Sequence, residues 1–130
     1  MDDFYIENKI YYHDTDSGGV VYYANYLKHL EEARTEFCLN RGLDIKKIAQ
    51  EGIFFVIAHI ELAYKSPARY LDTIRISAAI DKIGRSSVNF TQRITRGDTL
   101  LVEAKVTWVC VSRDFKPRSI PDAVKGLLQK

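Results

Sequence analysis

The chain has 130 residues, a length typical of one domain, and 46% of them are hydrophobic, which is enough for one core. A formal net charge of only +2, without a long basic run, argues against a nucleic-acid-binding protein. We therefore expect a single domain over residues 1–130, in which any anionic partner is bound by local charge.

The two cysteines predict a reducing environment. Cys38 and Cys110 lie far apart in the sequence, so we expect small buried thiols and no disulfide framework. No apolar run approaches the roughly 18 residues of a membrane span. Residues 1–4 are acidic and unlike a cleavable signal. These features predict a cytoplasmic protein without a membrane span.

The first half of the chain predicts a strand and two helices. Residues 4–12 alternate loosely between apolar and polar side chains, as a half-buried strand does. After two glycines, apolar residues recur over 23–37 at spacings of three and four, which predicts one long amphipathic helix. Gly42 suits the end of this helix, and Asp44 can cap a short helix that ends near Gln50.

Four further strands are predicted in the second half. They cover residues 53–64, 71–80, 88–94 and 99–112, which are rich in β-branched and aromatic residues or alternate with a period of two. Residues 106–111 are too uniformly apolar for a sheet with one wet face, so we expect a partner subunit to cover them. The pattern alone predicts an α+β fold with an antiparallel sheet.

The most informative segment directly precedes the long helix. Residues 12–26 read Tyr-His-Asp-Thr-Asp-Ser-Gly-Gly-Val-Val-Tyr-Tyr-Ala-Asn-Tyr. Glycines let a ligand approach the backbone closely, and a helix start presents unpaired N–H groups and a positive dipole end. A carboxylate beside such donors is suited to the chemistry of carbonyl groups.

At these residues the chain resembles the hotdog-fold acyl-CoA thioesterases of the YbgC type, relatives of 4-hydroxybenzoyl-CoA thioesterase. The resemblance continues, in the same order, through residues 65–69, 84–93, 109–111 and 115–121. It implies a five-stranded antiparallel sheet wrapped around one long central helix. It also implies hydrolysis of acyl-CoA to free acid and coenzyme A, no metal or redox cofactor, and a homodimer or homotetramer with its site at the subunit interface.

The resemblance implies a role for each residue of the catalytic loop. Asp16 matches the family carboxylate that acts as nucleophile or general base, and we expect it to be buried near the glycines. The backbone N–H of Tyr23 matches the donor that polarises the carbonyl, and Gly19 allows access. Many YbgC-type proteins carry histidine at position 23, whereas tyrosine resembles the 4-hydroxybenzoyl-CoA branch. Asp14 is expected to shape the loop, and Glu31 is a weaker candidate base.

The substrate side of the site has candidates of two kinds. Tyr22 and Tyr26 can line an acyl pocket, although such a stripe also fits an ordinary core. Coenzyme A carries phosphates, so basic or polar residues are expected at the mouth of the site, where each cation could equally be a solvated surface group. These candidates are Lys65, Arg69, Arg85 and Ser86. An acyl-carrier-protein thioester is an alternative substrate.

Other functions remain open at this stage. If Asp14 and Asp16 only cap the turn, the chain is a non-catalytic hotdog module that binds acyl-CoA or acyl carrier protein. A hotdog dehydratase would need a histidine–acid pair, which the sequence pattern does not reveal. His13 and the two aspartates are too closely spaced to form a metal site without further ligands. His29 and His59 are expected to be structural.

Overall fold

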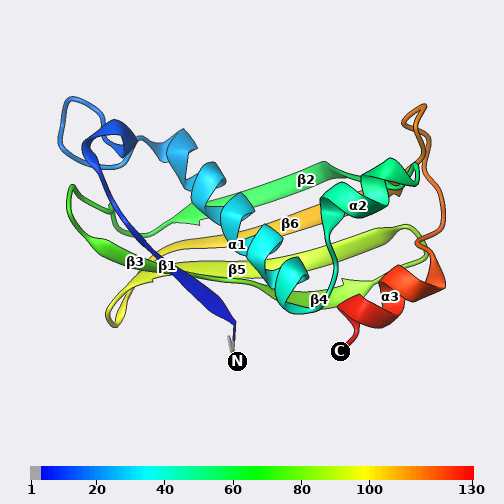
Figure 1. Ribbon diagram of the computed structural model, residues 1–130. Helices are drawn as coiled ribbons and strands as arrows, with labels where there is room; N and C mark the ends of the chain where they lie inside the picture. The colour runs from blue at the N-terminus through cyan, green and yellow to red at the C-terminus, as the bar shows by residue number, and fades with distance from the viewer. Residues whose placement is uncertain (1–3) are drawn as a thin grey trace.

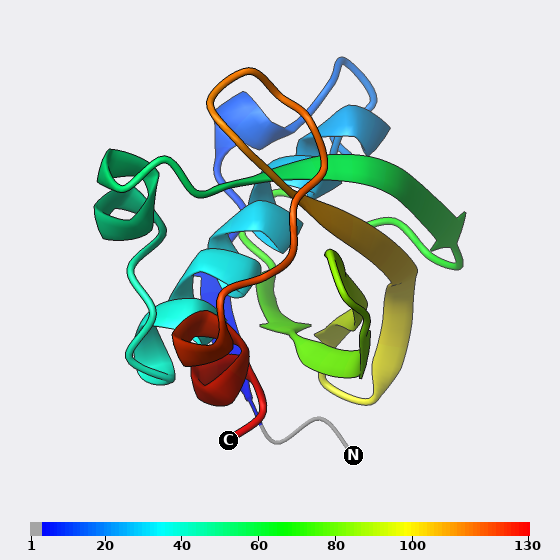
Figure 2. The same cartoon turned by 90° about the vertical axis from the view of Figure 1, so that its right-hand side faces the viewer.

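The computed structural model describes residues 4–130, and it has an antiparallel sheet curved around one long helix (Figure 1). Helix α1 (Tyr26–Asn40) lies within the curve of the sheet (Figure 2). The strands are hydrogen-bonded in the order β1 (Tyr5–Lys9), β3 (Thr73–Ser77), β5 (Ser87–Arg96), β6 (Thr99–Val111) and β2 (Phe54–Tyr64), and β4 (Ala79–Ile83) also pairs with β5.

Short helical segments complete the described chain: the 3-10 turns η1 (Tyr12–Asp14) and η2 (Tyr23–Asn25), and the helices α2 (Ile45–Gln50) and α3 (Asp122–Leu128). The predicted cap of α2 is confirmed, because the Asp44 side chain accepts from the Lys46 N–H at 2.9 Å. Helix α3 is missing from the sequence-based prediction because only two of its positions are buried, too few to show a helical period. Within residues 4–130, no helix has the length and apolar character needed to cross a membrane.

The core lies between α1 and the concave face of the sheet. Leu30, Ala33 and Phe37 point into it from the helix, at the spacings of three and four that predicted an amphipathic helix. The ring of Phe37 meets that of Phe90 on β5 edge to face, with centroids 5.9 Å apart. Burial of Leu30 and of Phe37 contributes about 1.5–3 kcal/mol each, which holds α1 in a fixed position over the sheet.

The predicted strand over residues 71–80 is two strands, so the described sheet has six strands and not five. Both β3 and β4 pair with β5, but the ladder is interrupted between them. The Gln92 side chain donates to the Ser77 carbonyl at 3.2 Å, and the Ser77 hydroxyl accepts from the Arg93 N–H at 2.9 Å. Side chains therefore replace backbone pairing at this point, which a two-residue period in the sequence does not reveal.

Strand β2 is an apolar strand at the edge of the sheet, whereas the segment expected to be covered by a partner lies inside the sheet. Residues 106–111 lie in β6, a central strand between β5 and β2, with Val106, Trp108 and Cys110 buried. Strand β2 pairs with β6 on one side and has no strand on its other side among residues 4–130. Its Ile57 is 50% exposed. An apolar edge of this kind is a natural place for a second chain to pair.

Candidate active site

The loop before α1 forms a hairpin whose tip carries the predicted catalytic carboxylate (blue, beside the start of α1 in Figure 1). Thr15 and Val21 form an antiparallel bridge. The Asp16 N–H donates to the Val20 carbonyl at 2.9 Å, and the Gly19 N–H donates back to the Asp16 carbonyl at 3.1 Å. Gly19 has φ +78°, where glycine alone is unstrained, so the turn requires a glycine there.

The Asp16 side chain is exposed in the single chain, which corrects the expectation that it is buried near the glycines. The reason is the hairpin, which projects its tip away from the core. Asp16 Oδ1 accepts the Gly18 N–H at 2.8 Å. Its Oδ2 has no hydrogen-bond partner within the described part of the chain. One carboxylate oxygen is thus anchored by the turn, and the other remains available for chemistry.

The start of the helical segment presents free donors next to this hairpin. The Tyr22 N–H donates to the Asp14 carbonyl at 3.0 Å, and the Asn25 N–H donates to the Tyr22 carbonyl at 2.8 Å. Between them, the N–H groups of Tyr23 and Ala24 have no acceptor among residues 4–130. Unpaired N–H groups at the positive end of a helix stabilise negative charge that develops on an oxygen.

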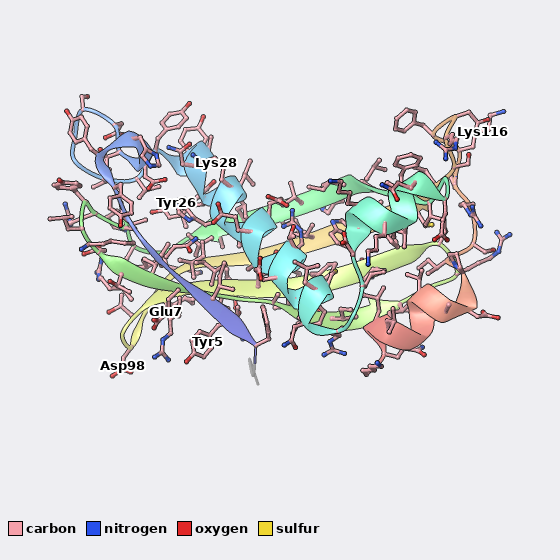
Figure 3. The ribbon with its side chains drawn as sticks, in the orientation of Figure 1. Tyr5, Glu7, Tyr26, Lys28, Asp98 and Lys116 are labelled. Carbon is pink, nitrogen blue, oxygen red and sulfur yellow. The ribbon has the colours of Figure 1, made fainter. Side chains whose placement is uncertain are left out.

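A pocket of about 280 Å³ lies beside these donors. Tyr26, at the start of α1 (Figure 3), is buried there, and its hydroxyl accepts the Ala68 N–H at 2.9 Å. The Tyr64 hydroxyl donates to the Tyr23 carbonyl at 3.3 Å. Burial raises the pKa of Tyr26 and of Tyr64, so both phenols stay neutral at ordinary pH. The lining residues are Val21, Tyr23, Tyr26, Tyr64, Lys65, Ser66 and Pro67.

The pocket is therefore lined by some of the predicted substrate-binding residues and by one residue that was not predicted. Tyr26 and Lys65 line it, whereas Tyr22 does not; the Tyr22 ring instead lies 4.8 Å from the ring of Tyr23, outside the pocket. Tyr64 is the residue that the sequence-based prediction missed. Its position at the end of a predicted strand, directly before Lys65, is the only signal in the sequence that points to it.

The basic candidates lie at two ends of the molecule. Arg69 forms a β-bridge with Val20, which places it beside the hairpin. Ser86 is at the opposite end, because its carbonyl accepts the N–H of Cys110 at 2.7 Å. Tyr64, beside the pocket, pairs with Val102. Positions 102 and 110 on β6 are separated by about 26 Å of extended strand. One chain therefore does not bring Ser86, or the adjacent Arg85, to its own pocket.

A buried histidine–acid pair connects the residue just before the hairpin to α1. The Asp14 side chain is 2% exposed, and its Oδ1 lies 3.2 Å from His29 Nε2. The sequence pattern does not reveal this pair, because the two residues lie on different elements. Within residues 4–130, no three His, Cys, Asp or Glu side chains are grouped so that they could hold a metal ion.

Comparisons with known proteins show the family to which the chain belongs. The sequence profile of the thioesterase-like superfamily matches residues 11–128. The acyl-CoA thioester hydrolase YbgC of Escherichia coli O6:H1 is 39% identical over 118 residues, which cover 89% of this chain and 88% of that protein. The acyl-CoA thioesterase YbgC of Helicobacter pylori is 38% identical, over 92% of this chain and 96% of its own.

Solved structures show the same architecture. A probable thioesterase from Bartonella henselae has a TM-score of 0.86 at 31% identity, over 90% of this chain and 98% of that one. A protein from Thermus thermophilus has a TM-score of 0.93 at 25% identity, over 98% of both chains. The chain therefore belongs to the thioesterase-like superfamily, and within it to the YbgC-type acyl-CoA thioesterases. The predicted family, hotdog fold and class of enzyme are confirmed.

Proposed function

We propose that this chain hydrolyses acyl-CoA thioesters to a free acid and coenzyme A, with Asp16 as nucleophile or general base. The observation that carries the proposal is that backbone hydrogen bonds of one hairpin hold the Asp16 carboxylate and the Tyr23 N–H near each other. The Asp16 carboxylate has one unbonded oxygen, and the N–H of Tyr23 has no acceptor among the described residues. The bond from Asp16 N–H to Val20 and the bond from Tyr22 N–H to Asp14 tie both groups to the same short ladder.

The reaction follows from these two groups. The thioester carbonyl oxygen accepts from the Tyr23 N–H, which stabilises the negative charge that forms on it. Acting as nucleophile, Asp16 forms an acyl–aspartyl anhydride, the C–S bond breaks, and water then hydrolyses the anhydride. Acting as base, Asp16 takes a proton from water, the resulting hydroxide attacks the carbonyl carbon, and the C–S bond breaks as that proton passes to the departing coenzyme A thiolate. Neither route needs a metal or redox cofactor, since coenzyme A is part of the substrate.

We propose that the complete site lies at the subunit interface of a homodimer. This dimer is either the whole assembly or one half of a homotetramer. The uncovered edge of β2 runs from the pocket residue Tyr64 toward the end of the molecule that carries Arg85. If two copies pair antiparallel along this edge, the Arg85 end of one copy meets the pocket end of the other. Arg85 and Ser86 would then contact the coenzyme A phosphates at the partner's pocket, beside Lys65 and Arg69.

Thiol release tests the proposal. Wild-type protein, Asp16→Asn and Asp16→Ala are incubated with acyl-CoA esters from acetyl and benzoyl to palmitoyl, and with an acyl-carrier-protein thioester. Loss of the carboxylate should lower kcat by about 100-fold or more. The matched control is Asp98→Asn, in the exposed turn between β5 and β6 (Figure 3), which should keep full activity.

Binding separates the enzyme from the alternative module. Asp16→Asn should still bind acyl-CoA within a few-fold of the wild-type affinity, because the amide keeps the size of the side chain. If wild-type protein binds acyl-CoA and releases no thiol from any ester, the hydrolase proposal fails. The non-catalytic binding module is then the correct reading.

A further inference from the structure

The buried contact between Asp14 and His29 is not used by the proposed chemistry. His29 lies on α1 and is 6% exposed, and Asp14 ends η1 and is 2% exposed. The contact joins the catalytic hairpin to the central helix at 3.2 Å. A buried carboxylate without a partner is costly, so this pair fixes the position of Asp14.

The protonation form of His29 follows from its second partner. Asn8 Nδ2, on β1, donates to Glu32 Oε1 at 2.7 Å and lies 2.9 Å from His29 Nδ1. An amide nitrogen only donates, so His29 Nδ1 accepts, and the ring proton is on Nε2, where it donates to Asp14. Both ring nitrogens are therefore engaged. His29 is 6% exposed and does not line the pocket, so it is not placed to exchange a proton with a substrate there.

Asp14 also forms hydrogen bonds with residues on both sides of the hairpin. Its Oδ2 accepts the Tyr11 N–H at 3.1 Å, before the hairpin. Its carbonyl accepts the Tyr22 N–H at 3.0 Å and the Asn25 side-chain amide at 2.9 Å, after the hairpin. Asp14 is two residues before Asp16, and the Tyr22 that it holds directly precedes Tyr23.

We propose that His29 is a positioning residue for thioester hydrolysis, acting through Asp14. It holds the Asp16 carboxylate and the Tyr23 N–H in one fixed relationship, so that attack and charge stabilisation occur on the same carbonyl. This inference rests on the proposed function. Because a displacement of about 1 Å in a catalytic group can cost on the order of 100-fold in rate, loosening this pair acts on the chemical step.

Two variants of one position test the role. His29→Phe removes the donor to Asp14, and kcat for the best acyl-CoA substrate should fall by about 10- to 100-fold. KM should change by less than about threefold, because His29 does not line the pocket. His29→Gln supplies an amide donor in place of Nε2, and it should restore kcat to within about fivefold of wild type. The control is Cys38→Ala, a buried change farther along α1 that lowers stability without touching the hairpin.

Hydrogen exchange gives a readout that needs no activity. Amides of residues 11–25 should exchange faster in His29→Phe than in wild type or in His29→Gln. The inference would be overturned if His29→Phe had the kcat and the exchange rates of wild type. It would also be overturned if His29→Phe and His29→Gln lost kcat equally and had the same Tm. If wild type hydrolyses no thioester, the proposed function fails, while the exchange data still decide whether His29 orders the loop.

Nuclear magnetic resonance of the wild-type protein covers the case in which His29→Phe does not fold. A long-range ¹H–¹⁵N spectrum should show the neutral His29 ring with its proton on Nε2 and protected from exchange. A ring with its proton on Nδ1 would show that the donor to Asp14 is missing. That result would overturn the inference without any variant.

Discussion

Arg34 donates through Nη1 to the side-chain oxygen of Gln92 at 3.0 Å, and both side chains are buried between α1 and the sheet. Gln92 in turn donates to the Leu30 carbonyl at 3.0 Å and to the Ser77 carbonyl at 3.2 Å. Arg34 Nε has no partner among the described residues. Burial lowers the pKa of Arg34 because the charged form loses its hydration. This cation is therefore held in the core by an amide, and no carboxylate of residues 4–130 forms an ion pair with it.

Gln92→Leu should destabilise the protein by about 2–4 kcal/mol, because it removes an acceptor from a buried charge and two donors from backbone carbonyls. Arg34→Met should cost less, because it removes the buried charge and leaves only a neutral amide oxygen unpaired. Urea unfolding of the two variants and of the double variant measures both costs. An equal or greater loss in Arg34→Met would contradict the prediction.

Tyr23→Pro should fold and lose activity, because proline removes the backbone donor, in addition to the tyrosine ring that lines the pocket. The Tyr23 N–H has no acceptor among residues 4–130, and proline is tolerated at the first position of a helical turn. Tyr22 already has φ −60° and ψ 128°, the extended conformation favoured before proline. We expect kcat to fall by about 100-fold with Tm within a few degrees.

The side chain of Tyr23 supplies the control for that variant. Tyr23→Ala loses the ring, as the proline variant does, but keeps the N–H. Because Tyr23 is 60% exposed, this variant should keep kcat within about tenfold of wild type. Circular dichroism and thiol release measure folding and activity for both proteins. A Pro variant that is as active as the Ala variant would show that another group polarises the carbonyl.

Arg85→Gln should raise KM for acyl-CoA about fivefold and leave kcat nearly unchanged, because its proposed contact is with a phosphate far from the reacting carbonyl. The effect should be smaller at high salt, which screens this attraction. Lys47→Gln, which removes an exposed cation on α2, is the matched control and should leave KM unchanged. An equal change in KM for both variants would mean that only overall charge matters.

The stability of the fold should decline in alkaline solution through Cys38. Burial raises the pKa of its thiol from 9.0 to about 12. Below pH 9 the thiol is neutral in both states and carries no penalty. Between pH 9 and 12 the unfolded chain loses this proton while the folded chain keeps it, so stability falls by about 1.4 kcal/mol per pH unit.

Cys38→Ala isolates that contribution, because the variant lacks the thiol but keeps the other titrating groups. Its free energy of unfolding is lower at neutral pH, yet it should fall less steeply between pH 9 and 11 than that of wild type. Urea unfolding at several pH values gives both slopes. Parallel slopes would rule out a buried, neutral Cys38 as the cause.

Local patterns in the sequence determined the helix over residues 26–40, the cap at Asp44 and the hairpin glycines, because each depends on residues within a few positions of one another. The proposed catalytic loop could be recognised for the same reason, since Asp16, Gly19 and Tyr23 lie within one short segment. The family resemblance then supplied roles that spacing alone does not define.

Only the tertiary structure decided which distant residues meet. It paired Asp14 with His29, added Tyr64 to the pocket, interrupted the strand at Ser77 and placed Arg85 at the far end of the sheet. These contacts depend on sheet register and on the position of α1 above it. The register between strands is set by the packing of the whole core, so it cannot be predicted from a pattern within one segment.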